Sequence, residues 1–196
     1  MPSALTCNGS RVLTPTEADA IRAVISKPSA RALFDLLLYT GLRFSEVRQL
    51  AATPGIFDEE RGTLTIRSTK AKASQSGRNV ILGDRGRAAV AAFLEAGAKV
   101  PAHVSAWQQN LIRWAEAAHL APLPTPPEKG NPYGITVRTS RKTWESWLLS
   151  ACPAEIARIT LSQGHSETIA LRHYLNVSFT AAEREAIRAE VAGWCR

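Results

Sequence analysis

The sequence predicts a mostly α-helical α+β domain that carries a small antiparallel sheet or hairpin. Along most of the 196 residues, helix start and stop signals flank stretches in which apolar residues recur at helical spacing. Residues 63–83 instead contain alternating apolar and polar side chains, as half-buried strands do. Hydrophobic residues make up 45% of the chain and charged residues 21%, which is typical of a globular domain and argues against disorder.

The amino-terminal part contains an irregular segment and then two helices. Residues 1–10 show no periodic pattern, and we expect a flexible lead-in there. Thr14 and Glu17 have the spacing of a capping box, and Pro15 between them suits the first position of a helix. A second helix with a mostly buried apolar face is expected over 29–40.

The alternating segment predicts a hairpin. Residues 63–68 alternate strictly between polar and apolar side chains, and residues 78–82 read as the partner strand. The connection, residues 69–77, is small, polar and basic, so we expect a long mobile loop between the two strands.

The carboxy-terminal part is predicted to be helical, with one break rich in Pro and Gly. Ser105 and Gln108 have capping-box spacing at the start of one helix, and Thr180 and Glu183 have it at the start of the last helix. The apolar stripe of that last helix consists of Ile187, Val191 and Trp194. The remaining helices are expected over 85–97, 105–119, 138–151, 153–162 and 166–175, with the break over 122–134.

The charge balance suits a polyanionic partner. The chain has 24 Lys and Arg against 17 Asp and Glu, a net charge of +7 and an isoelectric point near 9.8. Cys7, Cys152 and Cys195 follow no metal-ligand spacing, so we expect free thiols in a reducing cytosol. Neither a signal peptide nor an apolar run of membrane-spanning length is visible, and we expect a cytoplasmic protein with no membrane partner.

The first candidate for chemistry is the segment Thr40-Gly-Leu-Arg43-Phe-Ser-Glu46. Gly41 ends one helix, and Arg43 lies in the turn before the next, where its guanidinium can face outward. Glu46 follows three residues later, where its carboxylate can orient that guanidinium. A helix corner with a surface arginine is the plain structural interpretation of the same residues.

The second candidate is the basic hairpin. Residues 61–87 contain seven cationic side chains and one acidic side chain, Asp84. A positive loop of this kind can lie along a phosphate backbone, although an exposed hairpin kept in solution by its charge has the same composition. The cationic residues are Arg61, Arg67, Lys70, Lys72, Arg78, Arg85 and Arg87.

Two further candidates lie toward the carboxy terminus. Arg138 and Arg141 are spaced to share a helix face, where like charges repel each other unless an anion lies between them. His165 and Tyr174 are 174 − 165 = 9 residues apart, and a short helix between them brings the tyrosine back toward the histidine. Each motif alone also fits an ordinary role, as a basic surface, a structural histidine or a packed tyrosine.

Taken in order, these candidates resemble the tyrosine recombinase family, which includes phage integrases and chromosome-dimer resolvases. The catalytic set of that family runs Arg, Lys, His-x-x-Arg, His or Trp, and Tyr. The resemblance implies a recombinase catalytic-domain fold over residues 11–178 and, over 179–196, a helix of the kind that family members often exchange between protomers. The matching residues are Arg43 supported by Glu46, Lys70 with Lys72 as the alternative, Arg138, Arg141, His165 and Tyr174.

Arg138 is a departure from the family pattern, which usually has histidine three residues before the second arginine. Some archaeal and archaeal-virus members carry a basic residue there, and the run Arg-Lys-Thr-Trp-Glu-Ser-Trp from Arg141 is similar to that branch. Arginine stays protonated near neutral pH, so the substitution removes proton transfer from this position and keeps charge stabilisation.

The resemblance implies a site-specific recombinase or integrase that needs neither ATP nor a metal. Tyr174 would attack the scissile phosphorus and form a 3′-phosphotyrosyl link, while Arg43 and Arg141 bind the non-bridging oxygens. Lys70 would protonate the departing 5′ oxygen. The implied partner is double-stranded DNA, on which family members assemble as homo-tetramers. Prokaryotic and viral members integrate viral genomes and other mobile genetic elements at the nucleoid.

Two other classes of protein fit the same residues. A type IB topoisomerase uses the same phosphotyrosine chemistry and would relax a supercoiled plasmid without recombinant products. A non-catalytic DNA-binding relative of the fold is the second alternative, and Arg138 is the feature that favours it. A covalent adduct on a nicked suicide substrate distinguishes the enzymes from the binding protein.

Overall fold

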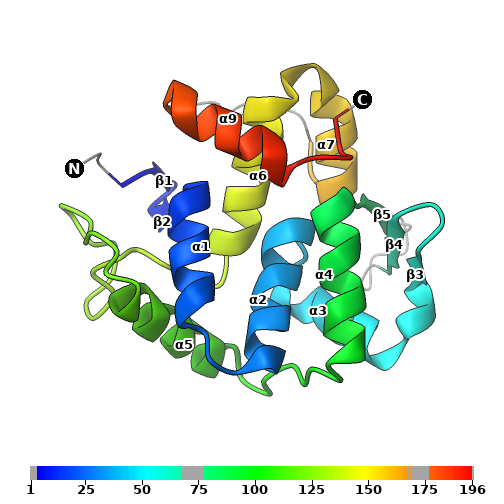
Figure 1. Ribbon diagram of the computed structural model, residues 1–196, viewed down its shortest axis with the longest axis horizontal. Coiled ribbons are helices and arrows are strands. Elements are labelled where there is room, and N and C mark those ends of the chain that lie inside the picture. Colours follow the sequence, from blue (N-terminus) through cyan, green and yellow to red (C-terminus); the bar gives the residue numbers. More distant parts are fainter. Residues whose placement is uncertain (1–3, 68–76, 167, 169–176, 196) are drawn as a thin grey trace.

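The computed structural model describes residues 4–67, 77–166, 168 and 177–195. Helices form most of the molecule, and a three-stranded antiparallel sheet lies at one side of them (Figure 1). The helices are α1 (Pro15–Val24), α2 (Pro28–Thr40), α3 (Phe44–Ala52), α4 (Asp84–Glu95), α5 (Val104–Ala117), α6 (Thr139–Ala151), α7 (Ile156–Gln163) and α9 (Ala181–Glu190). Short 3-10 helices occur at η1 (Pro54–Ile56) and η2 (Pro153–Glu155). The strands are β1 (Thr6–Cys7), β2 (Ser10–Arg11), β3 (Phe57–Asp58), β4 (Thr63–Ile66) and β5 (Arg78–Ile81).

The mostly helical fold class is confirmed, and so are the helix starts that depend on local capping. The Thr14 hydroxyl accepts from the Glu17 amide at 3.2 Å, and the Glu17 carboxylate accepts from the Thr14 amide at 3.1 Å. The same reciprocal pair opens α9 at Thr180 and Glu183. The helix expected over 166–175 lies almost entirely outside the described residues.

The predicted hairpin is present as β4 and β5, paired from Thr63 opposite Ile81 to Ile66 opposite Arg78. A third strand, β3, pairs antiparallel with β4. The sequence did not reveal β3, because a strand of two residues is too short to show an alternating pattern. The loop expected over 69–77 lies outside the described residues except for Gly77.

The core lies between the helices and is rich in tryptophan. Trp107, Trp144, Trp147 and Trp194 are all fully buried. Helix α2 packs against α4 on one side and α6 on the other, which explains why its exposed surface is so small. These contacts hold the carboxy-terminal end of α2, where the candidate site begins.

Within the segment 1–10, where a flexible lead-in is expected, the described residues form a short hairpin of β1 and β2, which turns at Asn8 and Gly9. The hairpin is held by Arg11, whose fully buried guanidinium pairs with Glu17 and donates to two loop carbonyls. Sequence periodicity cannot detect strands of this length, and the ion pair joins residues whose contact depends on the fold.

The capping box expected at Ser105 and Gln108 is wrong. Helix α5 begins at Val104, and its first turn has no side-chain cap. The Gln108 side chain instead accepts from the Val137 amide at 2.8 Å and donates to the Ile135 carbonyl. Gln108 therefore fixes the segment that leads into α6.

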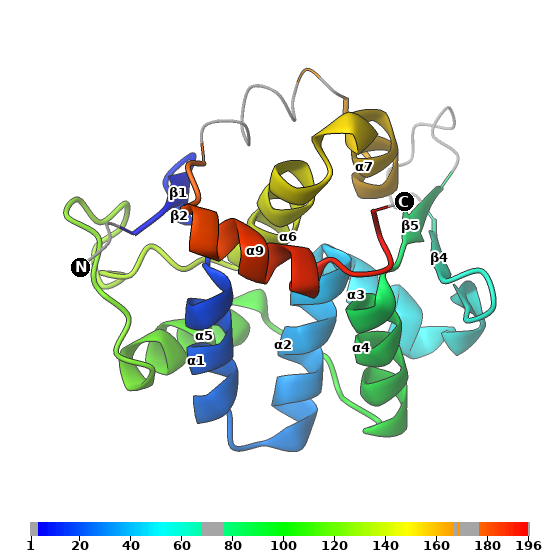
Figure 2. The ribbon, with the colours of Figure 1, turned by 45° about the horizontal axis from the view of Figure 1, so that its top comes forward.

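The carboxy-terminal helix docks on its own chain. Figure 2 shows α9 crossing the ends of α1 and α2 against α6. The expected apolar stripe of Ile187, Val191 and Trp194 is buried. The Trp194 indole donates to the Ile81 carbonyl at 3.0 Å, and the Tyr39 hydroxyl donates to Glu190 at 2.8 Å.

The expectation of three free thiols is wrong for two of them. Cys152 and Cys195 form a disulfide that fastens the end of the tail to the segment after α6, while Cys7 takes no part in this bond and is buried. The two bonded residues are 43 positions apart, so their pairing depends on the fold and no spacing motif reveals it.

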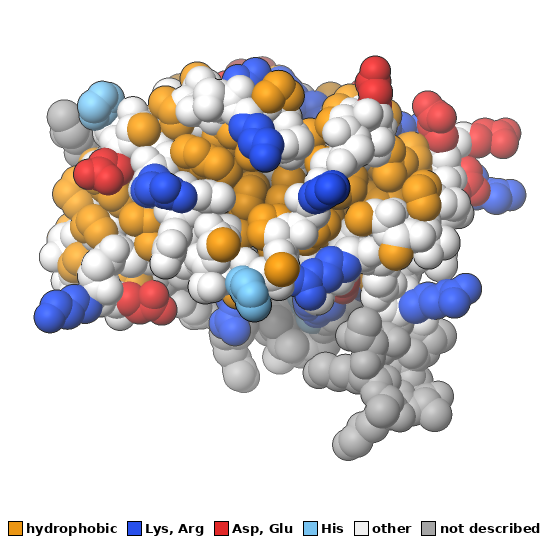
Figure 3. Space-filling view, turned by 90° about the horizontal axis from the view of Figure 1, so that it is seen from below, with side chains coloured by type: hydrophobic (Ala, Val, Ile, Leu, Met, Phe, Trp, Pro, Cys, Tyr) orange, Lys and Arg blue, Asp and Glu red, His pale blue; other side chains and the backbone are white. Residues whose placement is uncertain are grey.

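The lower face in Figure 1 has many exposed apolar atoms. Figure 3 views this face and shows apolar side chains gathered across it, with scattered Lys and Arg among them. An open hollow of about 590 Å³ between α3 and the end of α4 is lined largely by apolar side chains, including Ala51, Phe93 and Val100. Within the described part of the chain, no helix is both long and apolar enough to cross a membrane.

Candidate active site

Arg43 lies at the corner between α2 and α3, directly before the first residue of α3. Helix α2 ends at Gly41 in the left-handed conformation, with φ of 63°. Glu46 accepts from the Arg43 amide at 2.7 Å and from the Arg43 guanidinium at 2.8 Å. The Arg43 side chain is 51% exposed, whereas that of Glu46 is 8% exposed. The contact expected from their spacing is therefore present, and it holds a guanidinium that faces solvent.

Arg141, in the first turn of α6, joins this corner to the end of α7. Its guanidinium donates to the Gly41 carbonyl at 2.8 Å and to the Gln163 carbonyl, and it pairs with Glu145 at 3.1 Å. A side chain at Gly41 has no room, since its Cβ would lie 2.5 Å from the Gln163 amide oxygen and 2.9 Å from the Trp144 ring. Glycine is thus required at position 41 for two reasons: the left-handed turn that ends α2, and the close packing of Trp144 from α6 and Gln163 from α7 against its backbone.

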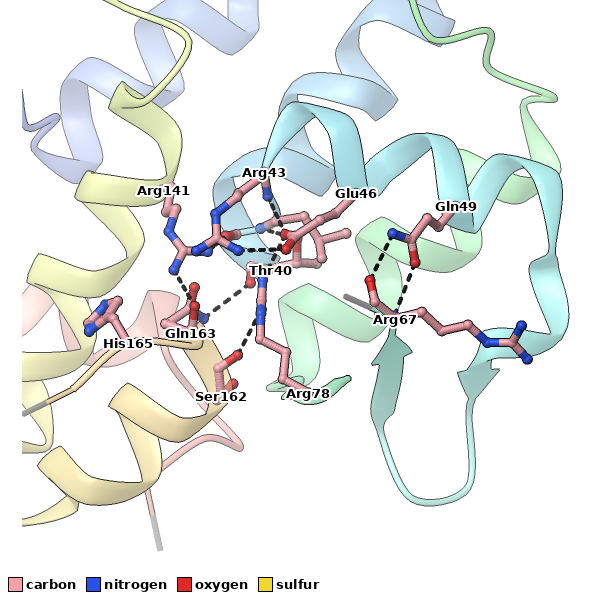
Figure 4. A network of polar contacts seen from close by, with 12 residues as sticks. Thr40, Arg43, Glu46, Gln49, Arg67, Arg78, Arg141, Ser162, Gln163 and His165 are labelled. Atoms are coloured by element: carbon pink, nitrogen blue, oxygen red, sulfur yellow. Dashed lines mark hydrogen bonds and ion pairs between the residues drawn. The ribbon is translucent and has the colours of Figure 1, made fainter. Parts of the chain in front are cut away.

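His165 follows α7 and lies beside Arg141 (Figure 4). Its Nε2 donates to Glu145 Oε1 at 2.9 Å, the same oxygen with which Arg141 pairs. Glu145 is fully buried, so it orients both side chains from below. Glu145 was not predicted as a site residue, although its position four residues after Arg141 on α6 was the available signal.

Arg78, the first residue of β5, is a second residue that the sequence did not single out for the site. Its guanidinium pairs with Glu46 at 2.7 Å and donates to the Ser162 carbonyl at 3.0 Å. Burial lowers the pKa of Arg78, Glu46 raises this pKa, and the nearby charges of Arg141 and Arg43 lower it again. Arg78 therefore lies close enough to Arg43 and Arg141 for their charges to affect its pKa.

Three guanidiniums from three separate parts of the chain thus meet in one region, which we call the arginine cluster: Arg43, Arg78 and Arg141 (Figure 4). Two carboxylates, Glu46 and Glu145, lie among them and fix their orientation. A surface with this surplus of fixed donors and positive charge is suited to binding a phosphate group.

Arg138 does not join the arginine cluster. It caps α6 with an exposed side chain, and among the described residues its guanidinium makes no hydrogen bond or ion pair. Its backbone has helical dihedral angles, with φ of −91° and ψ of −13°, and its carbonyl accepts from the Lys142 amide at 2.9 Å, so Arg138 continues the helix that carries Arg141. Lys70, Lys72 and Tyr174 lie outside the described residues.

The arginine cluster lies in a mostly helical domain that carries a three-stranded antiparallel sheet. The structure is similar to the crystal structure of XerA recombinase, with a TM-score of 0.62 over 91% of this chain and 17% sequence identity. The fold expected from the sequence is thus confirmed. The match covers 64% of the XerA recombinase chain. No protein-family model matches the sequence, and a comparison with curated proteins gives no match.

Proposed function

We propose that the chain is a tyrosine recombinase, a site-specific enzyme that cleaves and rejoins DNA strands through a 3′-phosphotyrosyl link to Tyr174. The observation that carries the proposal is the meeting of the two arginines matched to the family's catalytic pair. Arg141 donates to the carbonyl of Gly41, two residues before Arg43. The similarity of the fold to XerA recombinase supports the proposal. In this proposal residues 11–178 form the catalytic domain and residues 179–196 form its tail.

The arginines stabilise the charge that builds on the phosphate during cleavage. A guanidinium has five N–H groups in a fixed plane, so Arg43 and Arg141 retain donors for phosphate oxygens beyond those that bind protein. Their carboxylate partners hold them in place before the substrate binds, so little reorganisation is needed during the reaction. His165 lies beside Arg141 and is oriented by the same Glu145 carboxylate.

Tyr174 is the nucleophile, and Lys70 is the general acid, with Lys72 as the alternative. Tyr174 lies nine residues after His165 in the sequence, and Lys70 lies three residues after Arg67, where the described part of the hairpin ends. The phosphotyrosine retains the energy of the broken bond, so rejoining needs neither ATP nor a metal.

The partner is duplex DNA, bound chiefly through its phosphates. A net charge of +7 favours this partner. Binding releases the cations that are condensed on the DNA, and added salt opposes this release, so the affinity should fall steeply as the salt concentration rises. We propose assembly as a homo-tetramer on DNA, as the resemblance implies. Exchange of the tail between protomers would require reduction of the Cys152–Cys195 disulfide, which holds the tail on its own chain.

Removing either arginine tests the proposal. Arg43→Ala and Arg141→Ala should each slow cleavage of a nicked suicide substrate at least ~100-fold, the usual scale for losing one transition-state donor. Arg48→Ala is the matched control, because Arg48 lies on α3 with its guanidinium over the Phe44 ring and donates to the Pro101 and Ala102 carbonyls rather than to the arginine cluster. Equal rates for all three variants would remove the arginine cluster from the chemistry.

The role of Arg138 is tested by two substitutions at the exposed start of α6. If the bound phosphate receives a donor from this position, Arg138→His should cleave faster than Arg138→Ala, because imidazole supplies an N–H and alanine supplies none. Single-turnover cleavage rates measure the difference. Equal rates for the two variants would place Arg138 outside the site.

A further inference from the structure

The two carboxylates of the arginine cluster cancel most of its positive charge. Arg43 pairs with Glu46 at 2.8 Å. Arg141 pairs with Glu145 at 3.1 Å. Each of these pairs is neutral as a whole, because a guanidinium and a carboxylate carry opposite unit charges. Counted over the five side chains, three guanidiniums and two carboxylates leave a surplus of one positive charge, and the guanidinium outside the two pairs is that of Arg78.

Arg78 itself offers little to an approaching anion. Its side chain is 12% exposed, compared with 51% for Arg43. One guanidinium nitrogen donates to Glu46 at 2.7 Å and another to the Ser162 carbonyl at 3.0 Å (Figure 4). Its Nε is buried and has no acceptor in the part of the chain that the structure describes. Any effect of Arg78 on a bound anion therefore acts through Glu46 and not through direct contact.

Glu46 is shared between the two arginines. Its Oε1 accepts from the Arg43 guanidinium, while its Oε2 accepts from the Arg43 amide and from the Arg78 guanidinium, both at 2.7 Å. The Glu46 side chain is 8% exposed, so solvent and salt screen its charge only weakly. Without Arg78, Arg43 alone would balance this carboxylate, and an anion that arrives at Arg43 would be repelled by the negative charge behind it.

A purely structural role explains Arg78 less well. Its side chain does pack against the end of α7, since a Cβ at Gly164 would lie 2.6 Å from Arg78 Cδ. Desolvation of a buried ion pair is costly, however, and apolar residues of similar volume often stabilise a fold as well as the pair does. The Nε without an acceptor adds to this cost. Packing of β5 against α7 therefore does not require an arginine, whereas balancing Glu46 requires a cation.

We propose that Arg78 is a positioning residue for phosphate binding: it balances the charge of Glu46, so that Arg43 keeps its own charge for the anion. This inference rests on the proposed function for the identity of the anion, which is a phosphate of DNA. Arginine suits the role because it stays protonated near neutral pH even where burial lowers its pKa.

Binding of inorganic phosphate, measured by isothermal titration calorimetry at low ionic strength, tests this role. Arg78→Met keeps an unbranched apolar stem and removes the charge, so the cluster becomes neutral as a whole. The variant should bind phosphate roughly tenfold more weakly than wild type, the scale of removing one unit charge several ångströms from the ligand. Arg78→Lys keeps the charge, and its affinity should lie closer to that of wild type than to that of Arg78→Met.

The double variant with Arg78→Met and Glu46→Gln separates charge from packing. The glutamine amide is neutral and can still accept from Arg43, so the cluster regains a surplus of one positive charge. The double variant should therefore recover most of the phosphate affinity that Arg78→Met loses. If Arg78 were only a bridge between β5 and α7, the double variant would bind phosphate no better than Arg78→Met, and this result would overturn the inference.

Arg48→Met is the matched control, because it also removes one guanidinium from the protein. Arg48 lies over the Phe44 ring and donates to the Pro101 and Ala102 carbonyls, not to the arginine cluster. Its phosphate affinity should equal that of wild type. A loss as large as that of Arg78→Met would show that only the net charge of the protein matters, which contradicts the inference.

The outcomes also separate the inference from the proposed function, which the adduct with suicide DNA tests independently. An adduct without phosphate binding to wild type, or without the expected charge dependence, overturns the inference and leaves the proposed function standing. The expected charge dependence without an adduct overturns the proposed function and leaves Arg78 its role in phosphate binding.

Thermal melting of each variant identifies loss of folding. If Arg78→Met fails to fold, the single variant Glu46→Gln decides. It raises the surplus of the cluster to two positive charges, so it should bind phosphate more tightly than wild type. An unchanged or weaker affinity of this variant would overturn the inference.

Discussion

Tyr174→Phe should bind duplex DNA as wild type does and form no covalent adduct with it. The substitution keeps the aromatic ring and removes only the oxygen that attacks phosphorus. A gel-shift titration measures binding, and a denaturing gel after reaction with a nicked suicide substrate measures the adduct. An adduct at wild-type yield in the Phe variant would move the nucleophile to another residue.

The chain offers two matched controls, because it contains three tyrosines. Tyr39→Phe and Tyr133→Phe should both still form the adduct. Tyr39 is a poor nucleophile, because burial raises the pKa of its hydroxyl. The neighbouring Glu190 carboxylate, which accepts a hydrogen bond from this hydroxyl, raises the pKa further. Loss of the adduct in all three variants would point to disturbed folding, which thermal melting detects.

Lys70→Ala should cleave ordinary DNA very slowly and cleave the 5′-bridging phosphorothioate at nearly the wild-type rate. An alkoxide is a poor leaving group, because its conjugate acid is about as weak an acid as water. The thiol that corresponds to the sulfur leaving group has a pKa of about 8.5, so the thiolate leaves unprotonated. Rates of adduct formation on the two substrates measure the rescue.

Two further variants serve as controls for the rescue of Lys70→Ala by sulfur. Arg141→Ala should show no rescue, because its guanidinium acts on the non-bridging oxygens. Lys72→Ala should behave as wild type on both substrates. If sulfur rescues Lys72→Ala and not Lys70→Ala, the general acid is Lys72. If neither lysine variant is rescued, the proton comes from another group and the hairpin lysines hold only the DNA backbone.

Local patterns predicted the elements that depend on neighbours in sequence. The Thr14 and Glu17 cap and the β4–β5 hairpin are of this kind, because hydrogen bonding over three residues and alternation over a strand are visible in one segment. The contact of Arg43 with Glu46 is also local, so it was predictable from spacing alone.

The parts that the sequence did not reveal depend on tertiary contacts. Arg78 counted only as one of several hairpin cations, and its place in the arginine cluster follows from the packing of β5 against α7. Gln49 is an inconspicuous polar residue on α3 until the fold places Arg67 beside it.

The most direct measurement of the central claim is the reaction of the wild-type chain with a nicked suicide substrate, followed by peptide mapping of any DNA-linked product. The proposed function requires a covalent adduct that forms without ATP or added metal, in which the 3′ phosphate is joined to the peptide that contains Tyr174. DNA binding without an adduct, or an adduct joined to a different residue, would contradict it.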